Sequence, residues 1–135
     1  RVVVVEDNIV NQKLVKTMLT RAGHTVTVAA NGQLGVDEIK RSSEDRTGDF
    51  YNFVLMDVQM PVLDGIEATR QIRRLGHSKL VLPVVGLTAS FDPSEMDYYK
   101  SIGMNTCLGK PVRMKNLETI LDGILATTED YAGRT

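Results

Sequence analysis

Hydrophobic and polar residues follow two alternating periods along this chain. Five short, mainly apolar runs each stop at a polar residue or a glycine, a pattern typical of strands buried on both faces. These predicted strands are residues 2–5, 25–30, 53–56, 83–87 and 105–108. After each run, apolar residues recur at helical spacing, so a strand is followed by a helix five times. This order predicts an α/β fold, in which helices joined by right-handed crossovers cover both faces of a parallel sheet.

Local signals mark the ends of the predicted helices. Asn8 is typical of an N-cap before the first helix, and Gly23 is typical of the position after its end. Asp92 and Pro93 form a start signal of the same kind for the fourth helix. The last helical pattern fades near residue 126, and residues 127–135 are polar without a period. We therefore expect a domain of residues 1–126 followed by a polar tail or linker.

Composition excludes several classes of protein. Sixteen Lys and Arg residues against seventeen Asp and Glu residues give a net charge of −1, which argues against binding of nucleic acid by this domain. The longest apolar stretch, residues 80–87, is too short for a membrane span. The single cysteine, Cys107, suits a reducing compartment, so we expect a cytoplasmic domain without membrane contact. Because a strand begins at the first residue, we also expect the chain to be a piece of a longer protein.

Polar groups follow four of the five predicted strands. Glu6 and Asp7 follow the first strand, Asp57 the third, and Thr88 the fourth, while Lys110 comes just after the fifth. The carboxyl ends of parallel strands meet at one edge of the sheet, where ligands bind in open α/β folds. We therefore expect three carboxylates, a hydroxyl and an ammonium group to converge there.

The charges of these groups favour a particular chemistry. Two carboxylates about 5 Å apart at an effective dielectric constant near 20 repel by about 3 kcal/mol, so three must take up protons or hold a cation. Oxygen ligands that leave room for water suit Mg²⁺. A phosphoryl group fits between such an ion and Lys110, which points to in-line attack by an Asp carboxylate on phosphorus.

Four motifs carry a family resemblance. They are residues 6–13 (EDNIVNQK), residues 56–65 (MDVQMPVLDG), Thr88-Ala89 and Lys110-Pro111. Together they closely resemble the receiver domain of two-component response regulators, most of all receivers attached to hybrid histidine kinases. The resemblance covers about residues 1–126. It implies a flavodoxin-like (CheY-like) doubly wound sheet of five parallel strands in the order 2-1-3-4-5, with five helices.

The resemblance also assigns roles to the converging residues. It implies that Asp57 is the phosphoacceptor in a His-to-Asp phosphorelay, that Thr88 is the switch hydroxyl and that Lys110 supplies the counter-charge. The implied Mg²⁺ ligands are Glu6, Asp7, Asp57 and the backbone carbonyl of Gln59. Such a domain catalyses its own phosphorylation and dephosphorylation without turning over a separate substrate, and switches conformation when phosphorylated. A cis peptide bond before Pro111 is implied as well.

The implied phosphodonor is a histidine kinase or a histidine phosphotransfer domain. In the family, such partners approach the first helix and the loop after the lysine. The candidate docking residues around the site are therefore Asn8, Ile9, Val10, Asn11, Pro111 and Val112. Helical geometry independently supports Ile9 as a docking residue. Its side chain lies about 150° from the centre of the apolar stripe of its helix, on the solvent side. We therefore expect Ile9 to be exposed beside the site.

Position 107 departs from the family pattern. Receivers commonly carry an aromatic residue three positions before the lysine, which rotates inward when the threonine moves, but here that residue is Cys107. We expect phosphorylation at Asp57 to be retained and the segment from residue 88 to 108 to respond less, or by another route.

Three alternatives remain open at this point. A phosphatase with an Asp nucleophile needs a second acid two residues later, where this chain has Gln59. A receiver-like interaction module that no longer takes phosphate is suggested only by Cys107. A flavin or nucleotide binder lacks support, since neither glycine-rich phosphate-binding motif occurs.

Overall fold

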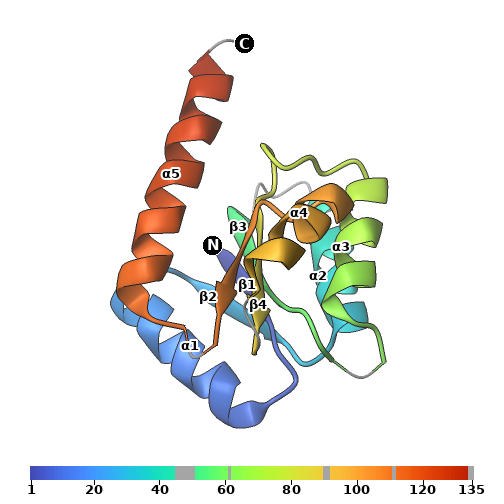
Figure 1. The fold of residues 1–135 in the computed structure, drawn as a ribbon, viewed down its shortest axis with the longest axis vertical. Helices are drawn as coiled ribbons and strands as arrows, with labels where there is room; N and C mark the ends of the chain where they lie inside the picture. The colour runs from blue at the N-terminus through green and yellow to red at the C-terminus, as the bar shows by residue number, and fades with distance from the viewer. Residues whose placement is uncertain (45–50, 61, 90–91, 111, 134–135) are drawn as a thin grey trace.

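The computed structural model describes residues 1–44, 51–60, 62–89, 92–110 and 112–133, with residues 125–133 described by their backbone alone (Figure 1). Its strands are β1 (Val2–Val5), β2 (Val26–Ala29), β3 (Phe53–Asp57), β4 (Val84–Thr88) and β5 (Thr106–Gly109). Its helices are α1 (Ile9–Arg21), α2 (Gly32–Glu44), α3 (Gly65–Arg74), α4 (Pro93–Ile102) and α5 (Met114–Gly133). The strands are parallel in the order β2-β1-β3-β4-β5, which confirms the predicted fold class.

The register of the sheet aligns the carboxyl ends of its strands. Val5 pairs with both Ala29 and Met56, so the residues after β1 and at the end of β3 lie next to each other. Asp57 pairs with Leu87, and Thr88 pairs with Gly109 immediately before the lysine. The predicted site residues therefore share one edge.

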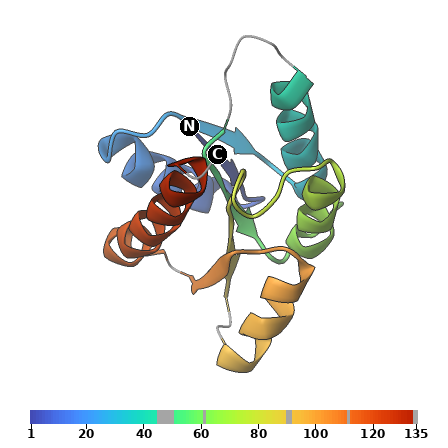
Figure 2. The same ribbon diagram turned by 90° about the horizontal axis from the view of Figure 1, so that it is seen from above.

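Two apolar layers hold the helices on the sheet. Helices α1 and α5 cover one face, and α2, α3 and α4 cover the other (Figure 2). The four valines of β1 are fully buried because alternate side chains enter the two layers. This explains why the run lacks the polar alternation of a half-exposed strand.

The start signals act as predicted. The side chain of Asn8 accepts a hydrogen bond from the backbone N–H of Asn11, which caps α1. Asp64 caps α3 in the same way, and Asp92 caps α4 with Pro93 in the first turn. These caps fix where each helix leaves the site edge.

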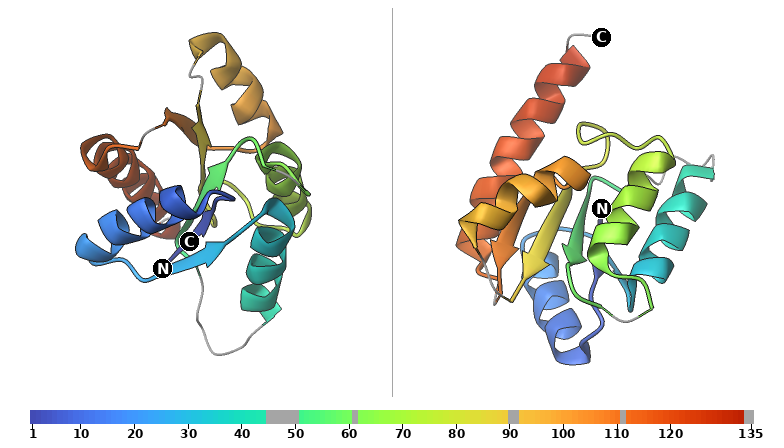
Figure 3. Two further views of the ribbon diagram at one scale, coloured as in Figure 1. Left: turned by 90° about the horizontal axis from the view of Figure 1, so that it is seen from below. Right: turned by 45° about the vertical axis from the view of Figure 1, so that its right-hand side comes forward.

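The last helix is longer than its apolar pattern predicts. The backbone of α5 stays helical to Gly133 and projects beyond the sheet, past residue 126, where the pattern placed the start of a polar tail (Figure 3). The reason is that polar residues such as Glu and Asp do not end a helix unless a breaker follows them. The domain boundary near residue 126 and the polar tail or linker after it stay predictions. Among the described helices, none combines the length and hydropathy needed to cross a bilayer.

Candidate phosphoryl-transfer and metal site

The predicted groups meet in a cavity of about 230 Å³ at the carboxyl edge of the sheet. Its lining contains Glu6, Asp7, Asp57, Thr88 and Lys110, together with Asn8, Asn11, Gln59 and Ala89. These residues come from the ends of β1, β3, β4 and β5 and from the first turn of α1. The convergence expected from the strand ends is therefore present.

The three carboxylates form a cluster. Glu6, Asp7 and Asp57 each offer one oxygen, and these atoms lie within 4.8 Å of one another. Glu6 and Asp57 are 1% and 3% exposed, whereas Asp7 is exposed, so the cluster opens to solvent on one side. An all-oxygen donor set with an open side fits Mg²⁺, which keeps several of its waters.

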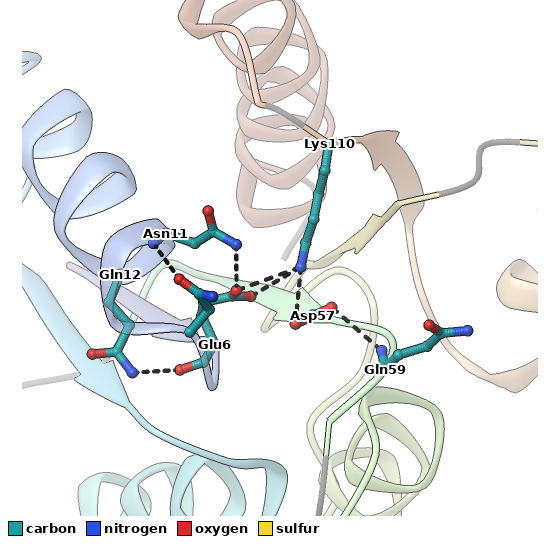
Figure 4. Close-up of polar contacts among 7 residues, drawn as sticks. Glu6, Asn11, Gln12, Asp57, Gln59 and Lys110 are labelled. Carbon is teal, nitrogen blue, oxygen red and sulfur yellow. Dashed lines mark hydrogen bonds and ion pairs between the residues drawn. The ribbon is translucent and has the colours of Figure 1, made fainter.

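Lys110 bridges two of the carboxylates. Its Nζ lies 2.9 Å from Oδ2 of Asp57 and 3.2 Å from Oε2 of Glu6 (Figure 4). Burial lowers the pKa of Lys110, but the hydrogen bond to Asp57 and the charges of both carboxylates outweigh it, so this pKa is raised. The ammonium group is therefore a permanent positive charge beside Asp57.

The surroundings of Asp57 disfavour the ionised form of its carboxyl group. Burial raises the pKa of its carboxyl group, and the hydrogen bond and charge of Glu6 raise it further, against the opposing effect of Lys110. A single ammonium group thus leaves the acidic cluster short of positive charge. A divalent cation in the cavity would supply the remainder.

Two polar residues of α1 hold Glu6 in place. The side-chain amide of Asn11 donates to Oε1 of Glu6 at 2.9 Å, and that of Gln12 donates to the Glu6 backbone carbonyl at 2.7 Å (Figure 4). Sequence reasoning named Asn11 for docking only and missed Gln12. The available signal was their spacing, since both lie on the first turn of a helix that starts directly after the acidic pair.

Gly65 brings α3 against the site. A Cβ atom at this position would lie 2.1 Å from the backbone oxygen of Asp57, and the Gly65 N–H donates to the carbonyl of Val58. Only glycine permits so close an approach of the two backbones. In the same loop the backbone N–H of Gln59 donates to Oδ1 of Asp57 at 3.3 Å, while the role of the Gln59 carbonyl stays a prediction.

The expected docking residues differ in their exposure. Ile9 and Val10 are 65% and 73% exposed, as helical geometry predicts for Ile9. Val112 is buried against the α1–α5 face of the sheet, which leaves it little surface for a partner. Pro111 and the peptide bond before it lie outside the described residues.

Comparisons with known proteins agree with this geometry. The sequence profile of the response regulator receiver domain matches residues 2–122. The chain belongs to the response regulator receiver domain family. As a receiver domain it is 42% identical, over 99% of its length, to the osmosensing histidine protein kinase SLN1 of Saccharomyces cerevisiae. It is 36% identical, over 94% of its length, to the peroxide stress-activated histidine kinase mak1 of Schizosaccharomyces pombe.

The receiver domain spans only a tenth or less of these two kinases, at 10% and 8% of their lengths. Among solved structures it resembles the receiver domain of sensor histidine kinase PA1611 from Pseudomonas aeruginosa, with 36% identity and a TM-score of 0.77. That match covers 93% of this chain and 96% of the other. The Pseudomonas structure contains a magnesium ion coordinated in its active-site cleft.

Proposed function

We propose that Asp57 accepts a phosphoryl group from a phosphohistidine and that Mg²⁺ is required. The observation that carries this proposal is the buried Asp57 carboxylate, which lies between an acidic cluster and the ammonium group of Lys110. Glu6, Asp7 and Asp57 would hold the ion with the Gln59 carbonyl. When bound, Mg²⁺ supplies the positive charge that neutralises phosphoryl oxygens during transfer.

The residues of this chain have distinct parts in the transfer. A carboxylate oxygen of Asp57 attacks phosphorus in line, the P–O bond forms, and the P–N bond to the histidine breaks with its electron pair going to the imidazole. Lys110 leaves the Asp57 oxygen and pairs with a phosphoryl oxygen. Thr88, which is buried at the end of β4 and lines the cavity, donates a hydrogen bond to another. Hydrolysis of the acyl phosphate by water resets the domain.

Mass spectrometry of the domain after incubation with acetyl phosphate and Mg²⁺ tests the proposal. One labile phosphoryl adduct is the expected result. Fast turnover of acetyl phosphate and of other small phosphate esters, without an adduct that accumulates, would instead favour a phosphatase. An unchanged mass would favour an interaction module, in which the acidic cluster survives without taking phosphate.

The raised pKa of Asp57 predicts a pH dependence of stability. In the metal-free domain the folded state holds the Asp57 proton more tightly than the unfolded chain does. The stabilisation from this proton is complete below the unfolded pKa of about 4 and is lost as the pH rises through the raised pKa. Because Mg²⁺ binds the ionised carboxylates, its apparent affinity should increase over the same range.

Urea unfolding of the wild-type domain and of Asp57→Asn, measured from about pH 4 to about pH 8, checks this dependence. Asparagine does not titrate there, so the difference between the two proteins isolates the Asp57 group. We expect wild type to lose stability relative to the variant as the pH rises without metal, and to regain it when Mg²⁺ is added. A difference that is independent of both pH and metal would contradict the assignment.

We further propose that the phosphodonor, a histidine kinase or histidine phosphotransfer domain, docks on the α1 end of the site edge. Ile9 and Val10 support this, because they are exposed apolar side chains next to the acidic cavity. The similarity to two histidine kinases supports a place for the domain within a larger histidine kinase of the hybrid type. We propose that it lies on the cytoplasmic side of that kinase.

Ile9→Asp should slow phosphotransfer from a phosphorylated histidine phosphotransfer domain about tenfold, the effect of losing about 1.4 kcal/mol of contact energy. Phosphorylation by acetyl phosphate should be unchanged, because this small donor needs no docking surface. Val81→Asp is the matched control, since Val81 is 58% exposed in the loop before β4, at the opposite end of the strands. Equal slowing of both donors by Ile9→Asp would contradict docking at this residue.

A further inference from the structure

The loop between β3 and α3 is held at two points by backbone hydrogen bonds. The N–H of Gly65 donates to the carbonyl of Val58 at 3.0 Å, which closes the loop on itself. The carbonyl of Leu63 accepts from the N–H of Gly32, the first residue of α2, at 3.2 Å. Helices α2 and α3 lie side by side on one face of the sheet, which brings the start of α2 to this loop (Figure 3). The loop is therefore fixed to α2 as well as to its own strand.

Gly32 permits this contact because it has no side chain. A Cβ atom at this position would lie 2.2 Å from the backbone oxygen of Leu63 and 3.2 Å from the Cβ atom of Ala68 in α3. The first distance is shorter than carbon and oxygen atoms tolerate without a bond, and a backbone oxygen cannot turn away as the end of a flexible side chain can. The N–H groups at the start of a helix have no partner within the helix, and this one is paired with the loop. Any other residue at position 32 would push the loop away from α2.

The backbone of the loop is unfavourable for its sequence. Val62 has a φ of 71°, in the left-handed region that β-branched residues rarely adopt, and its side chain is 81% exposed. Such a conformation persists only where the surrounding structure enforces it. The next residue, Leu63, supplies this constraint through its hydrogen bond to Gly32 and through its side chain, which packs against the apolar cluster of this face.

The same loop carries Gln59, whose backbone carbonyl is one of the proposed Mg²⁺ ligands. A side-chain ligand can turn about its own bonds to meet an ion, whereas a backbone carbonyl lies where the loop places it. The Gln59 N–H also donates to Oδ1 of Asp57 at 3.3 Å. The position of the loop therefore affects both a proposed metal ligand and the proposed phosphoacceptor.

We propose that Gly32 is a positioning residue for the Mg²⁺ site, which acts by holding the β3–α3 loop through Leu63. Gly32 is not among the described residues that line the cavity, so it acts on the ion only through the loop. A loop that is already held in place loses little freedom when the ion binds. By thermodynamic linkage, the bound ion in turn strengthens the contact between the loop and α2. This inference rests on the Mg²⁺ binding proposed above.

The first test is a Mg²⁺ titration of the metal-free domain, followed by backbone amide chemical shifts, in wild type and in Gly32→Ala. We expect the dissociation constant for Mg²⁺ to rise about tenfold or more in the variant, the usual effect of removing a contact that orients a metal ligand. The Gln59 amide should also shift in Gly32→Ala before any metal is added, because the loop has moved.

Ile39→Val is the matched control for this titration. Ile39 is 2% exposed in the apolar cluster and lies on the same helix, about two turns farther from the site, so the change weakens the packing of α2 without reaching the loop. This control should bind Mg²⁺ like wild type. An unchanged dissociation constant in Gly32→Ala would overturn the proposal. An equal rise in Ile39→Val would do the same, since the affinity would then follow the stability of α2 and not the loop contact.

Hydrogen exchange in wild type gives a second test, which does not depend on whether Gly32→Ala folds. Exchange of the Gly32 amide reports the opening of its hydrogen bond to Leu63. The Gly35 amide, which donates to the Asn31 carbonyl at the start of the same helix, is the reference. Saturating Mg²⁺ should slow the Gly32 amide at least about threefold more than the Gly35 amide. Equal slowing of the two amides would overturn the proposal.

Failure of the proposed function gives a different result. If Mg²⁺ shifts no amide at Asp57 or Gln59 in wild type, the metal site is overturned and the role of Gly32 with it. If wild type binds Mg²⁺ and Gly32→Ala binds it equally well, only the role of Gly32 is overturned.

Discussion

Replacing Asp57 with asparagine is expected to abolish the labile phosphoryl adduct that forms with acetyl phosphate and Mg²⁺. The amide lacks the anionic oxygen that attacks phosphorus, and one of the three carboxylates of the cluster is lost with it. The expected fall in the rate of phosphorylation is about 10⁴-fold or more, the scale of removing a nucleophile from an enzyme. Intact-protein mass spectrometry measures it directly.

Asp64→Asn is the matched control for this experiment. Asp64 lies in the same loop and caps α3 by accepting a hydrogen bond from the Glu67 N–H, a role that asparagine also fills. This variant should take up phosphate like wild type. If Asp57→Asn instead formed an adduct of the same lability at a comparable rate, the nucleophile would be another carboxylate, and Asp7, the exposed member of the cluster, would be the first to examine.

The fold could be predicted because its signals are local. Residues 2–5 form a valine run that only a strand buried on both faces accommodates, and the structure gives each of them 0% exposure. The caps at Asn8, Asp64 and Asp92 are likewise encoded within four residues of each helix start. The convergence of Glu6 and Asp57 followed from strand order, since parallel strands place their carboxyl ends together.

Contacts that depend on how a helix lies on the sheet could not be predicted in this way. The packing of Tyr99, and not of its neighbour Tyr98, into the apolar cluster depends on the rotation of α4 over the sheet, and no spacing in the chain encodes it. The spacing of Gln12 places it near Glu6, but its acceptor is a backbone carbonyl, a group that every residue offers, so the sequence does not single out this partner. The helix could not be predicted over residues 127–133, because apolar residues do not recur there at helical spacing.

Arg73 is the strongest case of a role invisible in the sequence. Its guanidinium group donates hydrogen bonds to the backbone carbonyls of Gly103, His77 and Leu82 at 2.7–2.9 Å, and to Oδ1 of Asn105 at 3.2 Å. Burial lowers its pKa to about 10, and the structure gives it neutral acceptors in the part of the chain that it describes. This cation therefore ties the end of α3 to the loop before β4 and to the turn between α4 and β5.

Arg73→Met should destabilise the domain by about 3 kcal/mol, because it leaves buried carbonyls in two loops without their donor, and each costs about 1–3 kcal/mol. Asn105 limits the loss, since its Oδ1 still accepts from the Val84 N–H. Arg74→Met is the matched control. The Arg74 side chain is 68% exposed and pairs only loosely with Glu67, so its loss should change stability by less than about 0.5 kcal/mol. Urea unfolding followed by circular dichroism compares the two, and equal midpoints would show that the guanidinium merely fills space between the loops.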